Sequence, residues 1–288
     1  MALHIIENES LRVRISDAGA ELTSVTDKAT GRERIWTADP AVWNRHAPIL
    51  FPFVGKVAGG RYRIGHREYE MKTQHGFARD MAFVCADEAA DHVTHTLAAT
   101  PETMEIYPFD FRLTVRHGLS GRRLAVDWTV ENAGGEEMLF SIGGHPGFLL
   151  PEGVRKEDCS ILFPGKDALS FVCASPQGLI RTRPKALRTE GGRARYRDDI
   201  PDTWIFEDGQ VRRVGIALPD GAPYVLLDCE QFPMLAVWAN PNGPFICLEP
   251  WFGRADDEGF TGTIDQKKGI QTLGPGEARS IGYSMEFC

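Results

Sequence analysis

The chain has 288 residues, 42% of them apolar, and a formal net charge of −8, which together indicate a soluble globular protein with a sizeable core. The acidic balance argues against a general nucleic-acid surface, because phosphate backbones are bound by clustered lysine and arginine. No apolar run approaches membrane-spanning length, so we expect no membrane partner. MALHIIENES lacks the basic start of a signal peptide, and the six cysteines show no CxxC pair. We therefore expect a cytoplasmic protein.

Short segments in which apolar and polar residues alternate, as in half-buried strands, recur along the chain. They include residues 11–15, 113–119 and 124–130, with a turn signal at 120–123. Two further predicted strands, 234–239 and 245–249, are mostly apolar and flank a second turn signal at 240–244. One short helix is expected to open near Asp39-Pro40, since proline suits the first helical position. The polar stretch 188–199 predicts an exposed loop. These patterns predict one all-β domain over residues 1–288, built as a large antiparallel β-sandwich.

The segment FSIGGHPGFLLP (residues 140–151) places His145 between a glycine pair and a Pro-Gly. Glycine allows positive φ or a close approach of the backbone to another group, and proline fixes its own φ. The apolar residues on both sides predict that this bend lies inside the protein. His145 is therefore either a structural residue of a tight turn or a constrained acid–base group.

The segment PFICLEPWFG (residues 244–253) places Glu249 in apolar company at the end of a predicted strand. Period-two geometry puts Phe245, Cys247 and Glu249 on one face, and Pro250 biases the glutamate towards an extended backbone. A carboxylate there must be paired, hydrogen-bonded or functional, because burying a free charge is costly. Trp251 either packs in the core or offers a flat face to a sugar ring.

A third group of polar residues lies in KTQHGFARD (residues 72–80), where His75 precedes a glycine and Arg79 follows four residues later. The alternatives are a turn residue for His75 and a surface ion pair for Arg79. Neither a P-loop nor a dinucleotide fingerprint is present, and no HxH or HExxH occurs. His92 and His95 would face opposite sides of a strand, so the sequence does not support a metal site.

Five segments, taken together and in order, resemble the aldose 1-epimerase (galactose mutarotase-like) family, nearest the branch associated with lactose operons. They are SDAGAELTSVTDKATGRERIW, APILFPFVGKVAGGRY, QHGFARD, FSIGGHPGF and CLEPWFG. The resemblance covers nearly the whole chain. It implies a β-sandwich of the supersandwich type with a sugar cleft on one sheet, a small-molecule sugar as partner, and no metal or organic cofactor.

The resemblance also implies roles for individual residues. His145 matches the general acid, Glu249 the general base, and His75 a second histidine that binds the sugar. Asp202, in DIPDTWIF, matches by order and context an aspartate that holds sugar hydroxyls. Two departures concern the substrate more than the reaction type: Lys56 stands where an arginine is common, and His145 follows a glycine where many relatives have asparagine.

The implied reaction interconverts α and β anomers through ring opening, which removes a proton from O1 and adds one to the ring oxygen. We expect an ionised Glu249 to take the first proton and a protonated His145 to supply the second. In the first alternative, a hexose-6-phosphate 1-epimerase, Arg79 would clamp the phosphate with Lys56 or a basic residue of RYR (61–63). The others are a non-catalytic sugar-binding protein and a glycosidase that pairs Glu249 with Asp202. The preferred aldose and the oligomeric state are not predicted.

Overall fold

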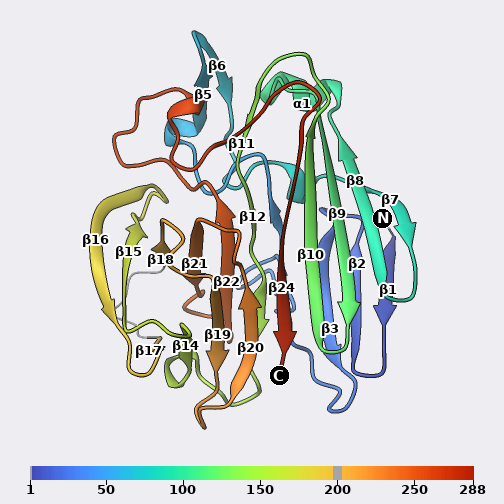
Figure 1. Ribbon diagram of the computed structural model, residues 1–288, viewed down its shortest axis with the longest axis vertical. Helices are drawn as coiled ribbons and strands as arrows, with labels where there is room; N and C mark the ends of the chain where they lie inside the picture. The colour runs from blue at the N-terminus through green and yellow to red at the C-terminus, as the bar shows by residue number, and fades with distance from the viewer. Residues whose placement is uncertain (1, 197–202) are drawn as a thin grey trace.

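The computed structural model describes residues 2–196 and 203–288, in which two large antiparallel sheets dominate (Figure 1). The nine-stranded sheet runs, in spatial order, through β17 (Arg193–Arg195), β14 (Ser160–Leu162), β19 (Arg213–Ala217), β20 (Pro223–Asp228), β24 (Ala278–Phe287), β10 (Arg123–Asn132), β9 (Phe111–Ser120), β8 (His92–Ala98) and β7 (Val84–Glu88). The eight-stranded sheet runs through β16 (Ile180–Arg188), β15 (Ala168–Ala174), β18 (Thr203–Phe206), β21 (Met234–Trp238), β22 (Phe245–Phe252), β12 (Ile142–Gly144) and β4 (Ile49–Leu50), with β13 (Gly147–Leu149) also paired to β22.

Three smaller sheets and a few short helical turns complete the described part of the chain. The sheets are β1 (Leu3–Glu7) with β2 (Leu11–Ser16) and β3 (Glu21–Asp27), β5 (Arg61–Ile64) with β6 (Arg67–Glu70), and β11 (Met138–Phe140) with β23 (Gln271–Leu273). The helices are α1 (Pro101–Ile106) and the 3-10 turns η1 (Ala58–Gly60), η2 (Ala78–Asp80), η3 (Lys156–Asp158) and η4 (Ile264–Gln266). Within residues 2–196 and 203–288, no helix is long and apolar enough to cross a membrane.

The main core lies between the two large sheets. Alternate residues of β9 and β10 are buried, as their sequence pattern predicts, and Trp128 of β10 is fully enclosed. Phe148 of β13 meets Phe287 of β24 across the two sheets, with ring centroids 6.3 Å apart. Each such side chain contributes roughly 1.5–3 kcal/mol of burial free energy. The predicted antiparallel β-sandwich is therefore confirmed, and its inner surface is apolar.

The turn predicted at 120–123 is present, but the helix predicted near Asp39 is wrong. The amides of Val42 and Trp43 both donate to the Asp39 carbonyl and Asp39 Oδ1 accepts from the Ala41 amide, which closes one turn and no more. The α-helix that does form, α1, begins behind a capping box in which the Thr100 and Thr103 side chains bond each other's backbone amides.

The loop predicted over residues 188–199 is interrupted by β17, which pairs with β14 at the edge of the nine-stranded sheet. In β17 the exposed Arg193 and Arg195 flank Ala194, whose methyl group is buried against the core. Residues 197–199 lie outside the described chain.

Candidate active site

Strand β22 positions the candidate base, and its two faces have different roles. Ile246 and Leu248 point into the main core, whereas Cys247, Glu249 and Trp251 point to the opposite face of the sheet. This confirms the period-two prediction for the segment. The strand continues to Phe252, so Glu249 lies within it and not at its end. Beyond Glu249, Pro250 and Trp251 still pair with Leu235 and Met234 of β21.

The Gly-Gly-His-Pro-Gly bend connects β12 to β13 and carries His145 over the same face. A Cβ at Gly143 would lie 2.5 Å from Cδ1 of Trp251, and one at Gly144 would lie 2.8 Å from the Tyr283 hydroxyl on the core side. Neither glycine has a positive φ, so both are needed for space and not for an unusual backbone conformation. The close approach on both faces fixes the backbone immediately before His145.

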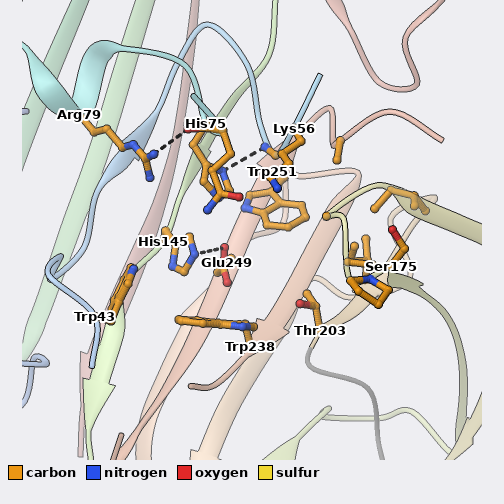
Figure 2. A pocket seen from close by; sticks show the side chains of 18 residues that line it. Trp43, Lys56, His75, Arg79, His145, Ser175, Thr203, Trp238, Glu249 and Trp251 are labelled. Atoms are coloured by element: carbon orange, nitrogen blue, oxygen red, sulfur yellow. Dashed lines mark hydrogen bonds and ion pairs between the residues drawn. The ribbon is translucent and has the colours of Figure 1, made fainter. Parts of the chain in front are cut away.

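His145 and Glu249, about a hundred residues apart in sequence, meet at the buried end of a cavity of about 280 Å³ (Figure 2). His145 Nε2 lies 3.2 Å from Glu249 Oε2, and the two side chains are 9% and 1% exposed. The ring of Trp43 lies 4.9 Å from that of His145, and the ring of Trp238 lies 5.5 Å away, between centroids. Together with Trp251, they give the cavity apolar walls around a polar end.

Burial sets the protonation of this pair. It raises the pKa of Glu249 well above its usual range, while the Trp251 indole acts in the opposite sense. It lowers the pKa of His145 to about 3, and the positive charge of Arg79 adds to that shift. The raised pKa of Glu249 and the lowered pKa of His145 both favour a single proton in the pair, held by the glutamate. This differs from the ionised Glu249 and protonated His145 that the reaction led us to expect, although the number of protons held by the pair is the same.

His75 is held in a single orientation beside the pair. Its backbone lies in the left-handed region at φ 69°, its amide donates to the Gly55 carbonyl, and the Gly55 amide donates to its Nδ1 at 3.0 Å. Burial and the neighbouring His145 keep its pKa well below the usual range, so the ring is neutral with its proton on Nε2. The two imidazole centroids are 5.5 Å apart. His75 can therefore donate one hydrogen bond into the cavity.

The other predicted binding residues differ in their surroundings. Arg79 lines the cavity, but its Nη2 donates to the Gln74 carbonyl at 2.7 Å and burial lowers its pKa. Lys56 is exposed at the rim. Asp202 lies outside the described residues. The structure thus brings together all of the described candidates around one cavity: Lys56, His75, Arg79, His145, Glu249 and Trp251.

Sequence reasoning missed several residues of the cavity wall, among them Trp43, Gln74, Ser175, Thr203 and Trp238. Trp238 carried a usable signal, because the turn at 240–244 pairs it with Cys247 and therefore puts it on the face of Glu249. Ser175 carried none, since it comes from the β15–β16 turn. Its buried hydroxyl has no hydrogen-bond partner among the described residues.

His145, Cys247 and Glu249 are also a possible metal-ligand group, because one ligand atom from each lies within 4.8 Å of the others. Burial raises the pKa of the Cys247 thiol well above its usual range, as it does for Glu249. A metal would have to displace a proton from each of these two groups. The same arrangement serves proton transfer directly, without that displacement.

Comparison with known proteins is consistent across sequence and structure. The family model described as aldose 1-epimerase matches residues 1–186. The plasmid and chromosomal forms of protein LacX from Lactococcus lactis subsp. lactis are each 31% identical over 292 aligned positions, which cover 97% of this chain and 97% of theirs.

Among solved structures, a galactose mutarotase related enzyme from Lactobacillus acidophilus is 31% identical with a TM-score of 0.93, covering 100% of this chain and 97% of that one. A galactose mutarotase-like protein from Lactobacillus casei ATCC 334 is 32% identical with a TM-score of 0.91, covering 100% of both chains. The galactose mutarotase-like fold expected from the resemblance is therefore confirmed.

Proposed function

Because the chain belongs to the aldose 1-epimerase family, we propose that it is an isomerase that interconverts the α and β anomers of a free aldohexose. One observation carries the proposal: His145 Nε2 lies 3.2 Å from Glu249 Oε2 at the buried end of a small cavity. Anomerisation needs only two proton transfers, one from O1 and one to the ring oxygen. A pair of groups that holds one mobile proton supplies both.

In the proposed mechanism Glu249 accepts the O1 proton and His145 delivers a proton to the ring oxygen. The proton that burial places on Glu249 first passes to His145, across the 3.2 Å that separates the two atoms. The C1–O5 bond then breaks as O1 becomes a carbonyl, and rotation about C1–C2 presents the other carbonyl face. The two transfers run in reverse to close the ring, so the pair ends in its starting state.

The walls of the cavity favour a pyranose as ligand. The rings of Trp43 and Trp238 lie 5.4 Å apart at an interplanar angle of 70°, which forms an apolar corner beside His145 (Figure 2). Such surfaces suit the C–H faces of a sugar ring, while a few fixed polar groups set its orientation. The Nε2–H of His75 is one of these groups, since its Nδ1 is already occupied by the Gly55 amide.

A hexose 6-phosphate is the second candidate substrate, because Lys56 and Arg79 add two cations to the cavity wall. We favour the free sugar because Arg79 is engaged with the Gln74 carbonyl, which leaves Lys56 as the exposed cation of the two. A protein that only binds sugar would gain nothing from a buried imidazole–carboxyl pair, since burying such groups is costly.

Polarimetry on freshly dissolved α anomers tests these alternatives. We expect catalytic amounts of protein to speed the approach to anomeric equilibrium of free aldohexoses much more than that of their 6-phosphates. Faster reaction of the phosphates would assign the protein to the second class. Rates equal to the buffer rate across the panel, with sugar binding retained, would establish the non-catalytic alternative.

A further inference from the structure

A second group of histidine and acidic side chains lies outside the sugar cleft and plays no part in the proposed reaction. His4 belongs to β1, Asp17 follows β2, and His95 belongs to β8. These strands lie at the side of the molecule opposite β15 and β16 (Figure 1). We propose that His4, Asp17 and His95 form a binding site for one Zn²⁺ ion.

The spacing of the three ligand atoms fits zinc. His4 Nε2 lies 2.9 Å from Asp17 Oδ1, His95 Nε2 lies 3.4 Å from the same oxygen, and all three atoms are within 4.8 Å of one another. Zinc bonds of about 2.0–2.1 Å in a tetrahedron hold ligand atoms about 3.3 Å apart. Small side-chain shifts would therefore admit the ion. Two imidazoles and one carboxylate suit zinc better than the all-oxygen sites that calcium and magnesium prefer.

His95 is the second, independent sign of a ligand. Its side chain is fully buried, and neither ring nitrogen has a hydrogen-bond partner within residues 2–196 and 203–288. Buried polar groups are nearly always paired, so an imidazole left in this state needs an explanation. Its Nε2 lies 3.4 Å from Asp17 Oδ1, and a zinc ion bound between them would give this nitrogen a partner.

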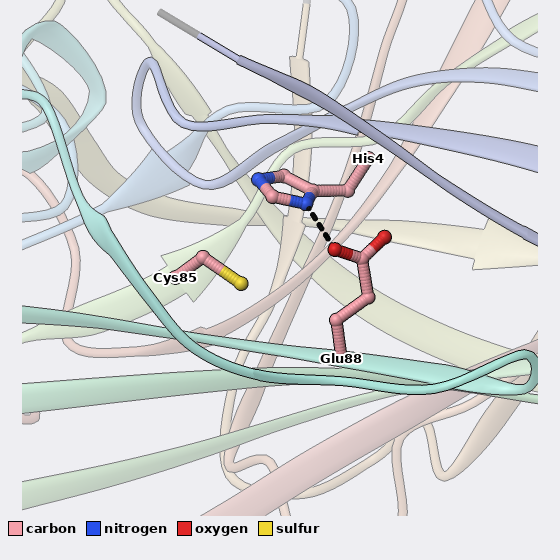
Figure 3. A group of neighbouring side chains, drawn as sticks. All are labelled: His4, Cys85 and Glu88. Carbon is pink, nitrogen blue, oxygen red and sulfur yellow. Dashed lines mark hydrogen bonds and ion pairs between the residues drawn. The ribbon is translucent and has the colours of Figure 1, made fainter.

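The groups behind the ligands are already in place. His4 Nδ1 lies 2.8 Å from Glu88 Oε2, with the Cys85 thiol beside the same ring (Figure 3). Histidines that bind a metal commonly donate their other N–H to a carboxylate, which fixes the ring and its tautomer. Asp17 is supported in the same way, because its Oδ2 accepts from the Ala2 amide at 2.7 Å.

The simpler reading is a metal-free tether, in which a protonated His4 bridges Asp17 and Glu88 and holds β1 in place. That reading accounts for both nitrogens of His4. It accounts for His95 only through the 3.4 Å approach of its Nε2 to Asp17 Oδ1, which forms no hydrogen bond among the described residues. In the zinc site, the ion replaces the proton on His4 Nε2 and also binds His95.

The test is a zinc titration of chelator-stripped protein against a chromophoric competitor, with metal analysis for stoichiometry. We expect one zinc per chain, binding at least about 100-fold weaker in His4→Ala and in His95→Ala, and about 10- to 100-fold weaker in Glu88→Gln. His92→Ala is the matched control, because His92 belongs to the same strand as His95 but pairs with surface carboxylates. Its zinc affinity should equal that of the wild type.

Two further readouts keep the result interpretable. His4 belongs to β1, a mostly exposed edge strand of the three-stranded sheet, whereas His95 is fully buried, so His4→Ala should fold even where His95→Ala does not. Circular dichroism identifies the folded variants. Cobalt substituted for zinc should give the intense visible bands of a tetrahedral site, lost in His4→Ala. Absence of stoichiometric binding would overturn the proposal. So would zinc binding that survives His4→Ala and is instead lost in Cys247→Ala, which would place the ion in the sugar cleft.

Discussion

Replacing Glu249 by glutamine tests the catalytic pair with little disturbance of the fold. Because burial raises the pKa of this carboxyl and so favours its neutral form, the amide has nearly the same shape and charge. We therefore expect the free energy of unfolding to change by about 1 kcal/mol or less. Glutamine cannot accept the O1 proton, however, so turnover should fall.

The size of that fall follows from the surroundings of the side chain. General acid–base groups contribute roughly 10²- to 10⁴-fold. Glu249 is 1% exposed, and no other carboxylate is among the described residues that line the cavity, so neither bulk water nor a neighbouring acid there can replace it. We expect a loss of about 10³- to 10⁴-fold in kcat, which corresponds to about 4–5.5 kcal/mol in the barrier.

Polarimetry gives the rate, thermal unfolding gives the stability, and calorimetric titration gives sugar affinity for the same samples. Cys247→Ala is the matched control, since this thiol lies on the same strand and face but transfers no proton in the mechanism. Its rate should stay within a few-fold of the wild type. A Glu249→Gln protein that keeps more than a tenth of the wild-type rate would refute the assignment of Glu249 as the base.

Three more predictions follow from the geometry of the cavity. Burial lowers the pKa of His145 to about 3 and raises that of Glu249, so the pair holds one proton across neutral pH. A pH series should therefore show kcat/KM unchanged as pH rises through 6.5. A fall in kcat/KM centred there would indicate an ordinary histidine acid. Gly143→Ala should lower stability by about 1–3 kcal/mol in denaturant titrations because its Cβ collides with an indole, whereas Gly135→Ala, which meets nothing within 4 Å, should be nearly neutral. Arg79→Ala should reduce the rates on free and phosphorylated hexoses equally, because it holds the backbone before His75; a loss confined to the phosphates would favour phosphate binding.

The fold was accessible from the sequence where one face of a strand is buried. Alternation identified β9 and β10, because burial on one side repeats every second residue. The two faces of β22 followed from strand geometry alone, since every residue of that strand is buried. The helix-start signal at Asp39 was misleading, because the chain closes only one turn there. Alternation also passed over β17, since three residues are too few to show a period.

The candidate site was only partly accessible. The two catalytic candidates and His75 came from local motifs and a family resemblance, and the structure places all three around one cavity. Trp43 was missed because its position depends on the turn that replaces the expected helix. The charge state of the pair could not be read from residue types at all, because it follows from burial, which is a property of the folded chain.

Exchange NMR between the α and β anomeric protons of a free aldohexose at equilibrium, with wild-type protein and with the His145→Asn/Glu249→Gln double variant, decides whether this pair catalyses anomerisation. We predict strong exchange cross-peaks at catalytic concentrations of the wild type. The double variant should be slowed about as much as either single variant, since the two groups serve one transition state. Exchange at the buffer rate with the wild type would show that the protein is not an anomerase, and exchange that persists in the folded double variant would show that His145 and Glu249 are not the acid–base pair.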